Sequence, residues 1–384
     1  MKTSTDRILT THVGSLARPN ALLETMREKE NGRPYDEAAF AAQVREAVVD
    51  VVHHQAEVGL DVVADGEMGK VSFLTYVDER ISGFEKIPGR SSMAPSWKRE
   101  LEMFPDYYQE YFKKYSHAVA PIHVMICRGP ITYVGQEAVA KDIANLKAAL
   151  AQVDVTEAFM PATSPRGFGG NEYYATEDEF NCALADALRE EYRAIVDAGL
   201  VLQVDDPGLT EILSDNPDST IEERRVEAGR HVEVVNYALR GIPEDRVRFH
   251  TCYGLNHGPR LHDVPLSEVV PFMLAVNAAA YSFEVANPRH QHEWRIWEDT
   301  KLPDGKLLIP GFLSHAMNFV EHPQLIADGI EQYANLVGRE NVIAGADCGF
   351  SSRASFSPEV HPSVVWAKFE ALAEGARLAS RELW

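Results

Sequence analysis

The sequence predicts an α/β protein built as a (β/α)8 barrel, and three observations lead to this fold. Short apolar runs alternate with longer amphipathic segments along most of the chain. Eight such apolar runs occur, which is the number of strands that closes this type of barrel. The glycine-rich fingerprints G-x-G-x-x-G after the first run and G-x-x-x-x-G-K-S/T are missing, which removes the usual reason to prefer an open doubly wound sheet.

The eight apolar runs read as β-strands, and the amphipathic segments between them read as helices. The predicted strands are, in chain order, Asp61–Asp65, His123–Cys127, Val155–Met160, Leu200–Val204, Arg246–Thr251, Ala280–Glu284, Leu307–Phe312 and Val342–Ala346. The predicted helices have apolar residues at i, i+3, i+4 spacing and are Glu37–Val58, Glu137–Gln152, Glu177–Ala198, Ile221–Leu239, Ser267–Asn277, Pro323–Leu336 and Val364–Ala379. Together they predict one catalytic domain over residues 1–384.

Two segments interrupt this alternation. The leader Arg7–Pro19 precedes the first predicted strand, and we expect it to fold over the barrel mouth. A segment at about 84–122, inserted after the first strand, is rich in aromatic residues and too long for an ordinary connection. We expect it to be a lid or an interface element, which leaves a homo-oligomer open.

Composition narrows the class of protein. The 384 residues carry a formal net charge of −21, which argues against nucleic-acid and anionic-membrane partners because both require a basic face. No signal-peptide pattern and no run of 18 apolar residues occurs, so we expect a cytoplasmic protein. Four dispersed cysteines are too few for a disulfide framework and are expected to be reduced.

Chemically capable side chains follow the later predicted strands. His250 and Cys252 end the fifth strand, Glu284 ends the sixth, and Cys348 follows the eighth. A barrel brings strand ends together at one mouth, so distance in sequence does not prevent shared coordination. One imidazole, two thiolates and a carboxylate form a ligand set that suits tetrahedral Zn²⁺. The sequence therefore predicts a zinc site.

Each of these motifs also has a simpler interpretation. A lone His-x-Cys is more often a buried structural pair than a metal site. Here the additional strand-end residues Glu284 and Cys348 make a metal site the favoured interpretation. Asp205 and Asp206 precede Pro207-Gly208, where a carboxylate often caps a helix or begins a turn. Glu67 and Ser15 have similar readings as turn and loop residues.

At this point the motifs resemble a known family. ILTTHVGSLARP, VVADGE, GPITYVG, LQVDDPGL, HTC, SFE, IPGFLSHAMNFVEHP and AGADCGF occur in the order of the catalytic barrel of cobalamin-independent methionine synthase. The resemblance covers most of the chain, without the second, N-terminal barrel of that family. Among shorter relatives, the chain is similar to epoxyalkane:coenzyme M transferase in DGEMGKVSFLTYVDERISGFE, HGPRLHDVPL and ANPRHQHEW.

The resemblance implies a role for each matching residue. It assigns the zinc ligands, which are His250, Cys252, Glu284 and Cys348. It implies that Ser15 and Glu67 hold the polar end of a thiol substrate, that Asp205 lies near its amino group, and that His315 is a catalytic histidine. Arg289, in the loop after the sixth strand, is a separate candidate for an anionic substrate group.

Two departures from the family pattern concern the methyl donor. Asp206 stands where a glutamate is expected, and GPITYVGQE lacks the tryptophan of the donor region. The resemblance thus implies a zinc-dependent thiol alkyltransferase that methylates homocysteine, with folate or another compound as the donor. Addition of coenzyme M to an epoxide is the alternative reaction.

Two hypotheses from other classes keep the barrel but not this chemistry. A uroporphyrinogen decarboxylase-like enzyme would need no zinc, but it demands basic side chains where this chain has acidic and sulfur-bearing ones. A non-enzymatic zinc or thiol sensor would bind metal without turnover. Structural zinc ligands are normally close in sequence, whereas these are spread over three strands, which favours the enzyme.

Overall fold

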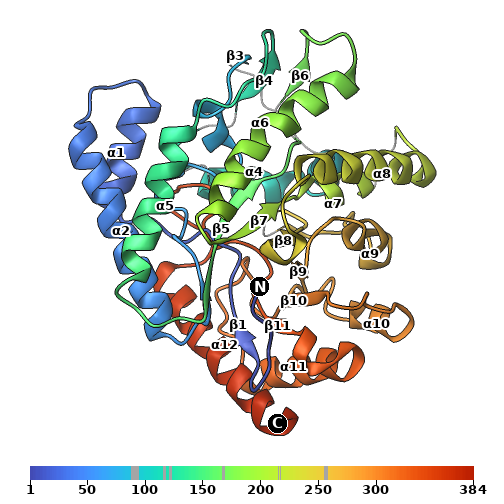
Figure 1. Cartoon of the computed structure of the whole chain (residues 1–384). Helices are drawn as coiled ribbons and strands as arrows, with labels where there is room; N and C mark the ends of the chain where they lie inside the picture. The colour runs from blue at the N-terminus through green and yellow to red at the C-terminus, as the bar shows by residue number, and fades with distance from the viewer. Residues whose placement is uncertain are drawn as a thin grey trace.

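A curled sheet of parallel strands forms the centre of the molecule, with helices around its outside (Figure 1). The computed structural model describes residues 1–87, 95–115, 118–120, 123–166, 169–214, 216, 218–254 and 258–384. The strands of the curled sheet are β1 (Leu9–Thr10), β2 (Val62–Val63), β5 (Glu157–Thr163), β7 (Val201–Asp205), β8 (Val247–His250), β9 (Ala280–Glu284), β10 (Leu307–Gly311) and β11 (Ile343–Ala344).

Pairing between neighbouring strands runs all the way round this sheet. Six strands pair in the order β10-β9-β8-β7-β5-β2, and β1 pairs with β11. Parallel bridges from Thr11 to Val62, from Leu308 to Val342 and from Gly311 to Gly345 join these two pieces. The fold is therefore barrel-like, and the carboxyl ends of all eight strands lie at one mouth.

The helices are those that the amphipathic pattern predicts, with additional short ones. In chain order they are α1 (Asn20–Glu30), α2 (Glu37–Glu57), α3 (Pro95–Met103), α4 (Pro105–Tyr115), α5 (Gln136–Leu150), α6 (Glu177–Asp197), α7 (Gly208–Leu213), α8 (Ile221–Ala238), α9 (Leu266–Leu274), α10 (Ile296–Asp299), α11 (Pro323–Val337) and α12 (Pro362–Leu383). Four 3-10 turns accompany them at Thr75–Glu79, Glu244–Arg246, Glu293–Arg295 and Arg339–Asn341. No helix in the described ranges is both long and apolar enough to cross a bilayer.

Helix starts follow local capping chemistry. At the start of α8, the Thr220 side chain accepts from the Glu223 N–H, and the Glu223 carboxylate accepts from the Thr220 N–H at 2.8 Å. Asp36 caps α2 in a similar way through the N–H groups of Ala38 and Ala39. These bonds satisfy donors that the first helical turn leaves unpaired.

The leader differs from its predicted position. Instead of preceding the first barrel strand it contains that strand, because Leu9 and Thr10 pair with Ile343 and Ala344 of β11. The residues after Thr10 then continue to the barrel mouth, where the Leu16 N–H donates to the Gly66 carbonyl.

The predicted strand His123–Cys127 is also placed differently. As β4 (Val124–Cys127) it lies outside the curled sheet, antiparallel to β3 (Phe84–Ile87) and parallel to β6 (Gly170–Asn171). Its residues alternate between half-buried and buried, as expected when one face of a strand is open, whereas β7 to β10 are buried throughout. The barrel thus has eight strands as predicted, but β1 takes the place of the predicted strand His123–Cys127.

Polar side chains fill part of the barrel interior and hold β1 in place. Arg248 on β8 is buried and donates to the Gln203 Oε1 at 2.6 Å, to the Thr11 Oγ1 at 3.0 Å and to the His12 carbonyl. Its guanidinium also lies 3.6 Å from the centroid of the Phe159 ring. Strands β1, β5, β7 and β8 are thereby joined beneath the mouth.

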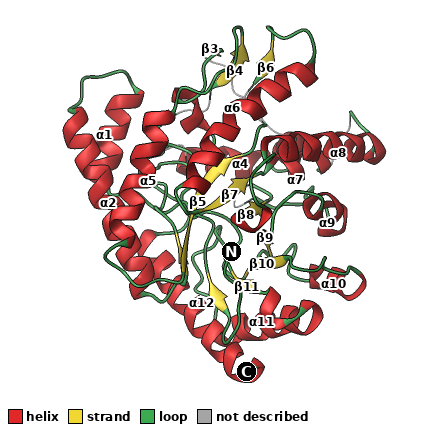
Figure 2. Ribbon diagram, in the orientation of Figure 1, coloured by secondary structure: helices red, strands yellow, loops and turns green. Residues whose placement is uncertain are grey.

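The inserted segment forms two helices over part of the mouth. Helices α3 and α4 follow β2 and β3, so the segment comes after the predicted strand Asp61–Asp65, which is the second strand of the barrel because β1 precedes it. Glu100 of α3 accepts from the Leu261 N–H at 2.6 Å, and Tyr111 of α4 donates to Glu359. Leu261 follows β8 and Glu359 follows β11, so both helices contact loops at the carboxyl ends of strands. Figure 2 shows the helices of the chain, α4 among them, in red and the strands of the sheet in yellow.

Candidate metal centre and active site

Two thiols and an imidazole meet at the ends of β8 and β11. The ligand atoms of His250, Cys252 and Cys348 all lie within 4.8 Å of one another, and all three residues are buried. Both cysteines are free, with their Sγ atoms 3.3 Å apart. The Cys252 sulfur accepts a hydrogen bond from Cys348, and this contact together with His250 lowers the pKa of the Cys252 thiol well below its ordinary value.

One nitrogen of the His250 ring has no hydrogen-bond partner. Its Nδ1 is hydrogen-bonded to Ser282 Oγ at 3.0 Å, whereas its Nε2 is buried and has no hydrogen-bond partner. A buried polar atom without a partner costs free energy. A metal ion with nitrogen and sulfur ligands would satisfy this nitrogen, and the hydrogen bond on Nδ1 orients the ring as is usual for a ligating histidine. The residues therefore fit a zinc ion.

Glu284, the fourth predicted ligand, ends β9 next to this group. Its Oε1 accepts from the Tyr253 N–H at 2.8 Å, and its Oε2 accepts from Asn287 at 3.1 Å. Burial acts to raise the pKa of Glu284, but the Arg260 guanidinium, together with the hydrogen bonds from Tyr253 and Asn287, outweighs burial and lowers it. The carboxylate is thus charged and oriented.

A second cluster joins Glu284 to His315 and Asp347, whose ligand atoms lie within 4.8 Å of one another. His315 Nε2 lies 3.1 Å from the Gly254 carbonyl. Because a carbonyl can only accept, Nε2 carries the proton and the buried, unpartnered Nδ1 is a proton acceptor. Burial lowers the pKa of His315, which keeps the ring neutral.

Asp347 is a site residue for which the sequence reasoning gave no role. Its Oδ1 accepts from the N–H groups of Val285 and Ala286 at 2.7 and 2.8 Å. These bonds fix the end of β9 against the end of β11. A carboxylate directly before a strand-end cysteine was the available signal.

The predicted substrate residues lie in the loops after β1 and β2 and at the end of β7. Ser15 Oγ is hydrogen-bonded to Ser352 Oγ at 3.1 Å. A Cβ atom on Gly349 would lie 2.0 Å from Ser15 Oγ, so only glycine fits beside Cys348 at this point. Ser15 therefore lies against Gly349, which is the residue after the candidate ligand Cys348.

The two predicted substrate carboxylates are both buried. Glu67 has a positive φ of 56°, and its Oε2 has no hydrogen-bond partner. Asp205 ends β7 directly opposite His250 of β8, and burial raises its pKa to about 7. Gln203 donates to Asp205 Oδ1 at 2.6 Å. The structure thus brings Asp205 close to the metal-binding candidates.

Three buried cationic side chains near the carboxylates of the site were not predicted from the sequence. Arg18 lies 3.9 Å from Glu67, and the Lys70 Nζ donates to the Pro161 carbonyl at 2.6 Å. Arg260 lies 3.7 Å from Glu284. By contrast, Arg289 is exposed on the loop after β9, apart from this buried cluster, and its role stays a prediction.

Asp206 caps a helix, as the simpler interpretation of its sequence position predicts. Its Oδ1 accepts from the Leu209 N–H at 3.1 Å in the first turn of α7, and its Oδ2 lies 2.5 Å from His231 Nε2 on α8. Asp206 therefore fixes α7 and α8, and it does not face the site with Asp205.

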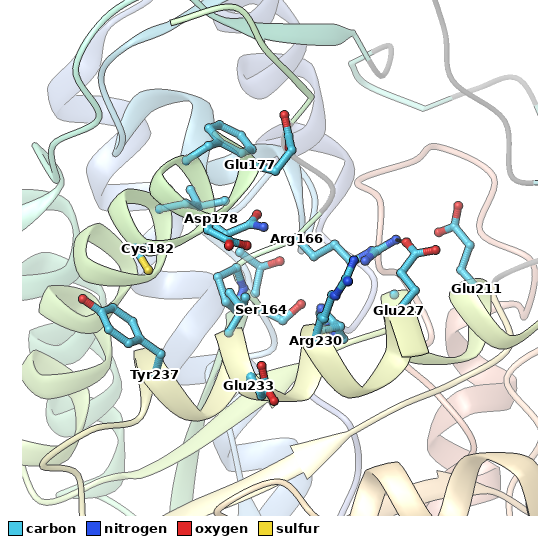
Figure 3. A pocket seen from close by; sticks show the side chains of 18 of the residues that line it. Ser164, Arg166, Glu177, Asp178, Cys182, Glu211, Glu227, Arg230, Glu233 and Tyr237 are labelled. Atoms are coloured by element: carbon cyan, nitrogen blue, oxygen red, sulfur yellow. Dashed lines mark hydrogen bonds and ion pairs between the residues drawn. The ribbon is translucent and has the colours of Figure 1, made fainter. Parts of the chain in front are cut away.

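A cavity of about 1320 Å³ lies elsewhere, between α6, α7 and α8 (Figure 3). Its polar lining includes Ser164, Arg166, Glu177, Asp178, Glu211, Glu227, Arg230 and Glu233. Helix α7 separates it from the thiols, since Gly208 and Glu211 line the cavity while Thr210 donates to the Cys252 carbonyl. The candidate ligands are not among its lining residues in the described ranges.

Comparison with known proteins agrees with the sequence resemblance. Residues 8–153 match the family model described as cobalamin-independent synthase, catalytic domain. A methionine synthase of Saccharolobus islandicus is 25% identical over 377 residues, which span 97% of this chain and 95% of that protein. The chain is therefore similar to the cobalamin-independent methionine synthases, over residues 8–153 by the family model and over most of its length by alignment with these relatives.

Two further matches define the extent of this likeness. A methionine synthase of Sulfolobus acidocaldarius is 28% identical over 254 residues, which span 64% of this chain and 61% of that protein. The structure of a B12-independent methionine synthase from Shewanella sp. W3-18-1 in complex with selenomethionine shares the fold, with a TM-score of 0.72 at 18% identity over 98% of this chain and 99% of that one. The family-model match ends before His250, so the ligand assignment depends on the geometry.

Proposed function

We propose that this protein is a zinc-dependent thiol S-methyltransferase that converts homocysteine to methionine. The bare, buried Nε2 of His250 beside two reduced thiols 3.3 Å apart is the observation that carries this proposal. The relatives named methionine synthase support homocysteine as the acceptor. The free cysteines support a reducing, cytoplasmic location.

His250, Cys252 and Cys348 would hold the zinc ion, with Glu284 as the fourth ligand. When bound, zinc favours the thiolate form of a coordinated substrate thiol, which is the nucleophilic form. Asp347 supports this arrangement by holding the end of β9, because its carboxylate accepts from two consecutive backbone N–H groups there. The protein part of the site is therefore organised before substrate arrives.

The opposite side of the mouth would hold the amino-acid end of homocysteine. We propose that Glu67 and Asp205 bind its ammonium group, because both are buried carboxylates and Glu67 Oε2 has no hydrogen-bond partner. Ser15 would donate to its carboxylate. Arg289, on the exposed loop, would act only at the rim, on an anionic group of the alkyl donor.

His315 would move the proton of the reaction. With Nε2–H donating to the Gly254 carbonyl, its Nδ1 can take the proton that leaves the incoming thiol. The same proton can then pass to the leaving group, which departs poorly as an anion. The thiol loses one proton and the leaving group gains one, so the histidine returns to its neutral state.

We further propose that α3 and α4 act as a lid. They contact the loops after β8 and β11 through Glu100 and Tyr111, and these loops carry the candidate ligands at their starts. A closed lid would exclude water while the thiolate reacts. An interface between subunits would use the same helices, and the oligomeric state in solution distinguishes the two.

Metal content and thiol turnover test the function. The parent should bind about one zinc per chain. Cys252→Ser should weaken zinc binding by about 100- to 1,000-fold, which corresponds to about one quarter of the binding free energy of a zinc site with four ligands. Cys182→Ser is the matched control, because this half-buried cysteine lies on α6, away from the site. Unchanged zinc affinity in Cys252→Ser would refute the site.

Turnover is then measured with homocysteine and a panel of methyl donors, comprising methyltetrahydrofolate, methylcobalamin, a methyl sulfonium and an aryl methyl compound. We expect methionine from one of them. Consumption of coenzyme M with epoxides, and not of homocysteine, would instead identify the alternative reaction. Thiol consumption in neither set would reject both substrates.

A further inference from the structure

A buried arginine in the loop between β8 and α9 lies beside Glu284. The Arg260 side chain is 7% exposed, and its Nη2 lies 3.7 Å from the Glu284 Oε1. Its Nε donates to Asp263 Oδ2 at 2.8 Å and its Nη1 donates to the Gly254 carbonyl at 3.3 Å. Nη2 is buried and makes no hydrogen bond. One donor group of the guanidinium is thus left over, on the side of Glu284.

The backbone at Arg260 is in a conformation that side chains rarely adopt. Its φ is +59°, and among the described residues only Glu67 shares a positive φ without being glycine. Such a conformation costs free energy and persists where surrounding contacts enforce it. Both residues lie in strand-end loops at the mouth. The arginine side chain is therefore kept here despite a backbone that would favour glycine.

Glu284 already has protein partners on both oxygens, from Tyr253 and Asn287. Arg260 is consequently not needed to orient the carboxylate in the arrangement seen. A carboxylate that moves within a dry site, however, loses stabilisation unless a cation is available to receive it. The unpaired Nη2 of Arg260 is such a group, at a distance that a small side-chain movement closes to hydrogen-bond length.

We propose that Arg260 is a positioning residue that receives the Glu284 carboxylate when an incoming thiol takes its place beside Cys252 and Cys348. This inference rests on the proposed function, in which Glu284 is a ligand. No covalent bond of the protein changes. The carboxylate exchanges one partner for another and remains buried against a guanidinium, with its charge compensated.

The inserted helices fix the position of this arginine. The N–H of Leu261, the next residue, donates to Glu100 Oε1 of α3 at 2.6 Å. Glu100 is buried and also accepts from Tyr108 of α4. The loop that carries Arg260 is therefore tied to both helices of the proposed lid, so lid position and guanidinium position change together.

Cobalt(II) and homocysteine are the probes for this role. Cobalt replaces zinc and reports thiolate coordination by its absorption, so homocysteine binding can be titrated without turnover. We compare the parent with Arg260→Gly, Arg260→Gln and Arg260→Lys. Glycine tolerates the positive φ and keeps the loop backbone while removing the guanidinium. Arg225→Gln, which breaks a half-exposed pair with Glu268 on α8 and α9, is the matched control.

Arg260→Gly and Arg260→Gln should keep cobalt affinity within about threefold and weaken homocysteine binding by about tenfold or more, the size of one hydrogen bond to a charged group. Arg260→Lys and added guanidinium with Arg260→Gly should restore part of this loss. In turnover, KM for homocysteine should rise more than kcat falls. Arg225→Gln should match the parent.

Several results would overturn the inference. Parent-like homocysteine binding by Arg260→Gly, or losses that neither lysine nor guanidinium restores, would show that the guanidinium is not the receiving group. Two cobalt ions per parent chain would mean that Glu284, His315 and Asp347 hold a second cation in place of this role. A parent that binds cobalt without any response to homocysteine would refute the proposed function itself.

Discussion

The two sides of the barrel mouth differ in how their buried charges are compensated. On the side of β8, β9 and β11, two thiols and the Glu284 carboxylate face a single buried guanidinium, that of Arg260. On the side of β1, β2 and β7, the carboxylates of Asp65, Glu67 and Asp205 share the interior with cations. These cations are Arg18, Lys70 and Arg248.

This difference indicates which side needs an added cation. Buried charges are normally paired within the protein or coordinate metal. The first side places the hydrogen-bonded sulfurs of Cys252 and Cys348 beside the His250 Nε2, which has no hydrogen-bond partner, and this is a donor set to which a metal ion binds. The second side is balanced by its own side chains. The buried carboxylates of this side are therefore compensated within the protein.

The largest expected effect comes from unbalancing the second side. Lys70→Met removes a buried cation while keeping the shape of the side chain, and we expect stability to fall by about 3–5 kcal/mol at pH 8. Burial already raises the pKa values of Asp65 and Glu67, and Lys70 opposes this. Protonated carboxyls need no cation, so the loss should shrink as the pH falls to 5.5.

Thermal or urea unfolding at both pH values measures this effect. Lys29→Met is the matched control, because Lys29 pairs with the exposed Glu79 at 2.6 Å, and such surface pairs contribute less than about 1 kcal/mol. Equal losses in the two variants would show that the second side is not charge-balanced by Lys70.

The sequence predicted the barrel and most of its mouth because period and strand-end position are local signals. It missed β1, because Leu9 and Thr10 are followed by Thr11 and His12, polar residues whose partners come from distant strands. The segment His123–Cys127 was predicted as a barrel strand, because an apolar run does not reveal that one face stays partly open.

The candidate site, like the fold, was predictable in part. His250, Cys252 and Cys348 could be expected together from their strand ends, and the structure brings them together. Arg260 and Asp347 could not, because their roles depend on which loop packs against which strand end. Charge balance across a mouth is a property of the folded chain and has no signature in one segment.

The second prediction tests whether the first side is the one that needs a cation. Saturating zinc, at about 100 times its dissociation constant, should raise the stability of the parent by about 3 kcal/mol. Cys348→Ser should gain little from zinc, since it lacks one sulfur of the group. Lys70→Met should gain about as much as the parent, because its defect lies on the other side.

Unfolding midpoints with zinc and with a chelator give this comparison directly. A gain from zinc in Cys348→Ser equal to that of the parent would place the ion elsewhere. A gain that disappears in Lys70→Met would show that the two sides are not independent.

The smallest effect concerns His290, which extends the network behind Arg260. Its ring lies 3.2 Å from the Asp263 carboxylate and 2.8 Å from that of Glu293, and it stacks on Tyr253. Burial acts to lower the pKa of His290, but these two carboxylates outweigh it and raise the pKa to about 9. The charged ring therefore stabilises the folded protein fully below pH 6.5, and this contribution is lost as the pH rises through about 9.

We expect the stability of the parent to fall by about 2–3 kcal/mol over that range from this group, and His290→Gln to lack this part of the slope. His292→Gln, two residues away on the same loop and exposed, should keep it. Unfolding midpoints between pH 6 and 9.5 decide the matter. If both variants keep the parent slope, the carboxylates around His290 do not hold its charge, and Asp263 is then free to serve Arg260 alone.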